Sequence, residues 1–211
     1  KDIYIVGYSE GGASALACQK MAEQRYASKI SIKHVIAGGG PYNLASSCDF
    51  FIKADQAAYP CSIPLLAIGL NYGDDLKLDF TKIFHGKLLT NYQEWFGGKK
   101  YSSFKINHFL NTHTISEFMH PDIFLPEMNP DFLKLYVSFR RNSLINWKPK
   151  NPLLLVHGKT DTYVPYLNAQ DAYDSFKAQG CPVELSTTKH GHLATVPYFY
   201  YKVTEILHKN E

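Results

Sequence analysis

Four short runs of apolar and β-branched residues recur along the chain, and each one leads into a loop that contains glycine. They lie at residues 3–6, 34–37, 152–157 and 182–187. Short apolar runs of this kind are typical of buried strands. Helical patterns follow three of them, at 11–26, 166–179 and 195–209. Alternation of strand and helix predicts an α/β fold, with a predominantly parallel sheet covered by helices on both faces.

More than a hundred residues, from about 43 to 150, separate the second predicted strand from the third. This is longer than an ordinary crossover connection. The segment contains helical patterns at 63–72 and 131–144 and many aromatic residues. We therefore predict one domain over 1–211, in which 43–150 form an inserted helical cap. Its aromatic side chains would pack the core of the cap or line a pocket for a lipid or aryl ester.

The composition agrees with a globular domain and excludes several partners. Of the 211 residues, 45% are hydrophobic and 19% are charged, as in proteins with a packed core. The net charge of +3 is spread along the chain without a basic run, so we expect no nucleic-acid partner. The longest apolar stretches are too short to span a bilayer.

The four cysteines do not form a CxxC pair, so we expect no metal site. Cys18 lies in a predicted helix and Cys181 next to a predicted strand, which indicates two buried thiols. Cys48 and Cys61 share one irregular segment and would be close enough in sequence to form a disulfide. Such a bond would favour a secreted or periplasmic protein.

The first predicted strand leads into the segment Gly7-Tyr8-Ser9-Glu10-Gly11, which matches the pattern G-x-S-x-G. Between a strand and a helix, this pattern predicts a tight turn that holds the serine at positive φ with its hydroxyl exposed. The residues two before and two after the serine are expected to crowd the turn, which explains both glycines. The N–H of Glu10, at the start of the helix, would bind an oxyanion. The alternative is a glycine-rich turn with a serine that takes part in no chemistry.

With this motif in place, the chain resembles the α/β-hydrolase superfamily. A second matching segment, 154–165, is similar to the family pattern H-G-x-x-D-x-x-V-P and assigns the acid to Asp161. Asp161 would otherwise be an ordinary turn residue. The motif at Ser9 and the sequence GGGPYNL at 38–44 resemble secretory-lipase-like and prolyl-oligopeptidase-like bacterial hydrolases. The large helical insertion fits the lipase-like group better.

The family's histidine follows the last strand, where this chain has two candidates, His190 and His192. Gly-His ahead of a helix favours His192, whereas His-Gly followed by small residues would favour His190. We take His192 as the base, which gives the order Ser9, Asp161, His192 that the family shows. His157, at the end of its strand, is expected to be structural.

The resemblance implies a serine hydrolase that cleaves carboxylic esters through an acyl-enzyme on Ser9, without a metal or an organic cofactor. The expected substrate is a small-molecule or lipid ester. Two alternatives stay open, a serine peptidase of the prolyl-oligopeptidase type and a non-catalytic binding module built on the same fold.

The family's sheet has further strands before the nucleophile strand, which here begins at residue 3. We therefore expect this chain to be the C-terminal portion of a hydrolase. A missing N-terminal segment or a second chain would complete the sheet and supply the second oxyanion N–H.

Overall fold

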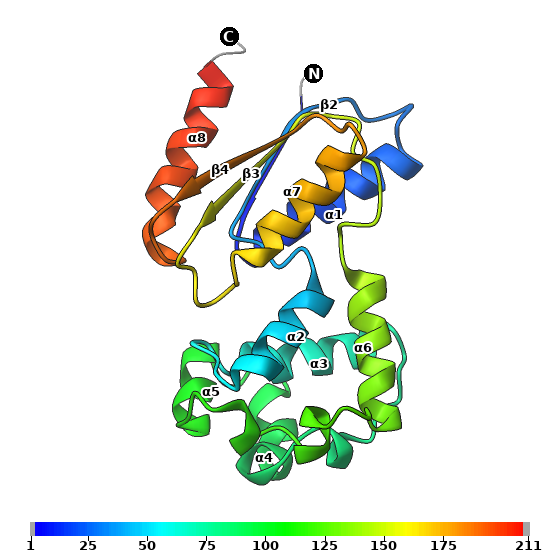
Figure 1. The fold of residues 1–211 in the computed structure, drawn as a ribbon, viewed down its shortest axis with the longest axis vertical. Helices are drawn as coiled ribbons and strands as arrows, with labels where there is room; N and C mark the ends of the chain where they lie inside the picture. Colours follow the sequence, from blue (N-terminus) through cyan, green and yellow to red (C-terminus); the bar gives the residue numbers. More distant parts are fainter. Residues whose placement is uncertain (1–2, 209–211) are drawn as a thin grey trace. The chain divides into compact units, whose positions relative to one another are not determined.

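In a computed structural model that describes residues 3–208, the four predicted strands form one parallel sheet (Figure 1). The strands are β1 (Ile3–Tyr8), β2 (Ile32–Gly38), β3 (Leu153–Gly158) and β4 (Val183–Thr188), and they pair in the order β1-β2-β3-β4. Because the strands are parallel and adjacent in sequence order, all four carboxyl ends lie at one edge of the sheet. This arrangement confirms the predicted α/β fold.

Alternate residues of the two central strands pack into two different cores. Val35 and Ala37 belong to one cluster of buried side chains, and Ile36, between them, belongs to another. Along β3, Leu153 and Leu155 alternate in the same way with Leu154 and Val156. Successive side chains of a strand point to opposite faces, so a strand covered on both faces is apolar throughout. This explains the continuous apolar runs in the sequence.

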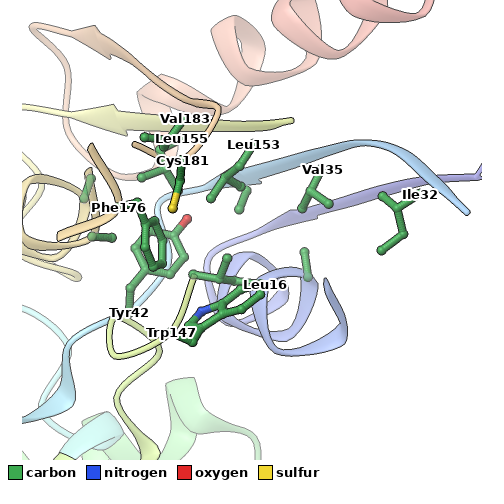
Figure 2. Close-up of a cluster of buried hydrophobic side chains, with 14 of the residues drawn as sticks. Leu16, Ile32, Val35, Tyr42, Trp147, Leu153, Leu155, Phe176, Cys181 and Val183 are labelled. Carbon is green, nitrogen blue, oxygen red and sulfur yellow. The ribbon is translucent and has the colours of Figure 1, made fainter. Parts of the chain in front are cut away.

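Three helices cover the two faces of the sheet. On one face lie α1 (Glu10–Arg25) and α7 (Leu167–Ala178), and on the other lies α8 (Val196–His208) (Figure 1). Figure 2 shows the larger core, where Leu16 of α1 and Phe176 of α7 are fully buried with Tyr42 and Trp147 close by. Phe199 of α8 is the corresponding buried aromatic residue on the opposite face.

The observed elements differ from the predicted ones mainly at their ends. β2 begins at Ile32, two residues before the predicted start. The predicted helix at 195–209 is divided, because Leu193–Thr195 form a 3₁₀ turn and α8 begins at Val196. Its predicted last residue, Lys209, lies outside the described residues.

The chain divides into two compact units, one made of Lys1–Ser47 with Ser143–Glu211 and the other of Cys48–Asn142. The connection between β2 and β3 is helical, as predicted. Its helices are α2 (Leu44–Ala54), α3 (Ser62–Gly73), α4 (Gly86–Phe96), α5 (Ser103–Leu110) and α6 (Pro130–Asn142), with 3₁₀ turns at Phe80–Lys82, Ile115–Glu117 and Pro121–Phe124. The prediction that residues 43–150 form a cap stays a prediction.

The helical unit has a core and a polar contact of its own. Phe80 stacks on Phe84 with ring centroids 4.8 Å apart, so part of the aromatic content serves internal packing. At the end of α3, Asp74 accepts hydrogen bonds from Ser138 at 2.6 Å and from Arg141 at 2.6 Å, both on α6. The pKa of this carboxyl is lowered, chiefly by the hydrogen bond from Ser138.

For the cysteines, the structure decides one possibility that the sequence left open and corrects one expectation. Cys48 and Cys61 are free thiols and form no disulfide, and burial raises the pKa of Cys48 to about 12 and that of Cys61 to about 11. Cys18 is exposed, because it points away from the side of α1 that contains Ala15, Leu16 and Gln19 and packs on the sheet. Cys181 is a buried thiol, as predicted.

Candidate active site

Ser9 lies in the turn between β1 and α1, at the carboxyl edge of the sheet. Its φ of 61° and ψ of −126° are a strained combination for a residue with a side chain, as predicted. The N–H of Ser9 donates to the carbonyl of Gly38 at the end of β2, at 2.8 Å, and its carbonyl accepts from the N–H of Gly12 at 2.9 Å. These backbone bonds hold the turn, so the strained conformation is imposed by the sheet and the helix together.

Close packing explains one glycine of the motif but not the other. A Cβ on Gly7 would overlap the carbonyl group of Gly11, so only glycine fits there. A Cβ on Gly11 would meet no atom within 4 Å, so the expectation that this position is crowded is wrong. Gly12 is crowded instead, because its Cβ would lie 2.5 Å from the carbonyl oxygen of Gly38. The helix thus approaches the end of β2 through Gly12.

Asp161 lies in the loop between β3 and α7 and is 7% exposed. Its Oδ1 accepts hydrogen bonds from the N–H groups of Tyr163 and Val164, each at 2.9 Å. Its Oδ2 lies 2.6 Å from Nδ1 of His192 and 3.4 Å from Nε2 of His157. The carboxylate is therefore held by its own loop on one oxygen and by two imidazole rings on the other.

His192 connects the other two residues. Its Nδ1 faces the carboxylate of Asp161, and its Nε2 lies 2.8 Å from Oγ of Ser9. Because a carboxylate only accepts, Nδ1 carries the hydrogen and Nε2 is free to accept the hydroxyl proton of Ser9. The structure thus brings Ser9, Asp161 and His192 together in one chain of hydrogen bonds. His190 has an exposed side chain and does not join them.

The charge state of Asp161 follows from these contacts. Burial acts to raise the pKa of this carboxyl, but hydrogen bonds from His157, His192 and the N–H of Val164 outweigh that effect and lower the pKa to about 2. The carboxyl is therefore ionised near neutral pH. An ionised carboxylate fixes the tautomer of His192 and stabilises its protonated form.

Two aromatic residues that the sequence did not single out support His192. Tyr8, next to Ser9 in the motif, donates from its hydroxyl to the carbonyl oxygen of His192 at 2.6 Å, and its ring lies 5.3 Å from the imidazole. Tyr163 stacks on the imidazole at 5.3 Å with an angle of 27°. The position of Tyr8 beside the serine was a signal, but its contact with a residue 184 positions away needs the fold.

Glu10 opens α1, so its N–H belongs to the first turn of a helix, where N–H groups lack intrahelical partners. Within residues 3–208, no group of three or more His, Cys, Asp or Glu side chains is arranged to hold a metal ion. No helix in the same range is long and apolar enough to cross a membrane.

This sheet, its helices and the serine turn define the α/β-hydrolase fold. The sequence pattern of the secretory lipase family matches residues 1–198, and the chain belongs to that family. A comparison with curated proteins finds no match.

Three solved structures show how widely the fold is shared. The rice cell wall degrading esterase LipA from Xanthomonas oryzae is 22% identical, with a TM-score of 0.82 over 100% of this chain and 59% of LipA. A putative hydrolase from Legionella pneumophila is 23% identical, with a TM-score of 0.81 over 99% of this chain and 56% of that one. Lipase A from Candida antarctica in its closed state is 18% identical, with a TM-score of 0.67 over 92% and 45%. The chain thus spans less than two thirds of the length of each.

Proposed function

We infer that the protein is a serine hydrolase that cleaves carboxylic esters through an acyl-enzyme on Ser9. One observation carries this inference. The Ser9 hydroxyl, on a strained strand-to-helix turn, lies within hydrogen-bond distance of an imidazole whose other nitrogen faces a buried carboxylate. The alternative, a turn whose serine takes part in no chemistry, does not explain why an imidazole and a buried carboxylate are aligned on that serine. Membership of the secretory lipase family supports esters as the substrate class.

The proposed reaction has two halves. Nε2 of His192 removes the proton of Ser9 as Oγ attacks the ester carbonyl carbon, and the same proton then passes to the departing alkoxide. Water, deprotonated by His192, attacks the resulting acyl-enzyme and releases the carboxylic acid. Asp161 stays ionised throughout and stabilises the imidazolium in both halves.

The N–H of Glu10 is proposed as an oxyanion donor. It belongs to the residue that follows the nucleophile and begins α1, where the helix dipole favours negative charge. Removal of one such donor in other serine hydrolases lowers kcat on the order of 10²- to 10³-fold. Most side-chain substitutions keep the backbone N–H, so Glu10→Gln should leave most activity intact. Glu10→Pro lacks the N–H and should lower kcat at least on the order of 10²-fold.

The helical unit Cys48–Asn142 is proposed as a cap that binds the acyl chain. In the chain it follows β2 and precedes β3. Several of its apolar side chains are exposed, among them Leu65 on α3, Phe104 on α5 and Val137 on α6. Apolar side chains of this kind are what an acyl chain requires. Substitution of Leu65 by Asp should weaken hydrolysis of long-chain esters more than that of acetate, and an equal effect on both would contradict this role.

The decisive experiment compares three variants on p-nitrophenyl esters. Ser9→Ala and His192→Gln should each lower kcat at least about 10³-fold. His190→Gln is the matched control, because it alters the neighbouring exposed histidine of the same loop and should keep wild-type activity. If Ser9→Ala keeps its activity, the nucleophile is wrong, and if His190→Gln loses activity while His192→Gln keeps it, the base is wrong. Preference for aminoacyl arylamides over esters would indicate a peptidase instead.

Secretion is proposed from the family alone, since the cysteines form no disulfide that would point to an oxidising compartment. Recovery of the protein in the culture medium of its source organism would support it, and recovery in the cell extract alone would contradict it.

A further inference from the structure

A second histidine, His157, lies beside the Asp161 carboxylate. It is the penultimate residue of β3, and its side chain is fully buried. Its Nε2 lies 3.0 Å from the carbonyl oxygen of Val164 and 3.4 Å from Oδ2 of Asp161. Both neighbours are hydrogen-bond acceptors near neutral pH. Nε2 must therefore carry the hydrogen and share it between the two oxygens.

The other ring nitrogen of His157 fixes the charge of the ring. Nδ1 is buried and has no hydrogen-bond partner among the described residues. A proton on Nδ1 would be a buried donor without an acceptor, which is strongly unfavourable. The environment therefore holds His157 as the neutral tautomer with its hydrogen on Nε2. A T-shaped contact with the ring of Tyr166, with centroids 5.9 Å apart, keeps the imidazole in this orientation.

The two oxygens of Asp161 are held in different ways. Oδ1 accepts two backbone N–H groups of its own loop, so the backbone determines its position. Oδ2, which faces Nδ1 of His192, is contacted instead by the two imidazole rings. One of these rings, His192, must move protons during the proposed reaction, so His157 is the partner that stays constant.

We propose that His157 is a positioning residue of the hydrolase, which donates a second hydrogen bond to Oδ2 of Asp161, fixes that oxygen toward His192 and limits the negative charge that His192 experiences. The proposal rests on the proposed function, since it assigns His157 a part in the same site. This role requires no contact between His157 and the reacting atoms, because His157 acts through Asp161.

The titratable groups around His157 and His192 must not obscure the titration of His192 that the test measures. They are Tyr8 on β1, Tyr163 in the loop of Asp161, Tyr166 before α7 and the exposed His190 in the loop after β4. Burial raises the pKa of Tyr8 to about 12 and also raises the pKa of Tyr166, so these two phenols are uncharged near neutral pH. His190 is a further histidine in the loop that carries His192, and the variants are therefore made in a His190→Gln background.

The test uses three substitutions of His157. His157→Phe keeps the size and planarity of the ring but removes the donor. His157→Asn keeps polarity, but its amide nitrogen reaches only the position of Nδ1. His157→Gln can bring an amide N–H to the position of Nε2 and serves as the matched control. For each protein, kcat and KM are measured against pH, and the titration of the His192 ring protons is followed by NMR.

The proposal predicts a specific pattern. In His157→Phe and His157→Asn, the negative charge of Asp161 is no longer offset by the hydrogen bond from His157 and therefore stabilises the protonated form of His192 more strongly. The titration midpoint of His192 and the acidic limb of the pH profile of kcat should both shift to higher pH by roughly 0.5 to 1 unit. The looser carboxylate should also lower kcat on the order of tenfold while KM stays unchanged. His157→Gln should restore both quantities toward the wild-type values. A role in packing alone would lower stability and leave the midpoint where it is.

The outcomes separate this proposal from the proposed function. An unchanged or lower midpoint in the Phe or Asn variant overturns the role of His157, even when the wild type is an active esterase. If the wild type hydrolyses no ester, the proposed function fails, while the NMR midpoint still tests the contact with Asp161. If neither variant folds, ¹⁵N NMR of the wild type decides, because a hydrogen found on Nδ1 rather than on Nε2 of His157 would contradict the proposal.

Discussion

The two glycines that define the serine motif are expected to respond in opposite ways to substitution by alanine. In Gly7→Ala the new Cβ overlaps the Gly11 carbonyl group, which is backbone and cannot rotate away. The turn or the helix must shift, at an expected loss of about 1–3 kcal/mol in the free energy of unfolding. Displacement of Ser9 by about 1 Å relative to His192 should lower kcat on the order of 10²-fold. In Gly11→Ala the new Cβ meets no atom within 4 Å. The position lies in α1 and its φ is not in the left-handed range, so alanine should stabilise the helix by up to about 1 kcal/mol.

The assay is urea unfolding followed by circular dichroism, together with p-nitrophenyl ester hydrolysis for both variants. Gly7→Ala should have a lower unfolding midpoint and little activity. Gly11→Ala should unfold at the wild-type midpoint or above it and remain active. A Gly7→Ala protein with wild-type stability and rate would refute the crowding argument, and so would a Gly11→Ala protein that is damaged as severely as Gly7→Ala.

Three further substitutions test the packing and charge of the site. Tyr8→Phe removes the 2.6 Å hydrogen bond to the carbonyl of His192. We expect kcat to fall several-fold and the free energy of unfolding, measured in urea, to fall by about 1 kcal/mol. Unchanged kinetics would show that this hydrogen bond does not support the position of His192. The Asp161 carboxyl has its pKa lowered to about 2 in the folded protein, so its stabilising effect is complete above the unfolded pKa near 4 and is lost as pH falls toward 2. Asp161→Asn should therefore flatten the fall in stability between about pH 4 and pH 2, by about 2 kcal/mol, and an unaltered slope would contradict this account. Asn168→Ala leaves the buried N–H of Asn43 without its acceptor at 2.9 Å, so about 1–3 kcal/mol should be lost in urea unfolding, and a loss below about 0.5 kcal/mol would show that the bond contributes little.

The sheet was predictable because its central strands are apolar on both faces. In β3 all six residues are buried, and the continuous apolar run from Leu153 onward is typical of such a strand covered on both faces. Element ends were less predictable, since the 3₁₀ turn at Leu193–Thr195 and the early start of β2 at Ile32 depend on pairing and loop geometry rather than on local pattern.

The three proposed catalytic residues were found from short motifs, because each motif encodes a local turn that presents one side chain. The choice between His190 and His192 was open in the sequence, and only the packed loop shows which imidazole lies against Asp161. The second imidazole on that carboxylate, His157, was taken as structural because its contact depends on the direction of a side chain at the end of a buried strand. Cys18 was misassigned for a similar reason, since a helix alone does not show which of its sides is buried.

The central claim is that Ser9 is a nucleophile activated by His192, and covalent labelling tests it most directly. The folded protein is treated with a fluorophosphonate probe, digested and mapped by mass spectrometry, with His192→Gln treated in parallel. The account predicts one adduct, on the peptide that contains Ser9, and little or no adduct in the His192→Gln protein. A wild-type protein that is folded but carries no adduct on Ser9, or that labels equally well without His192, would contradict it.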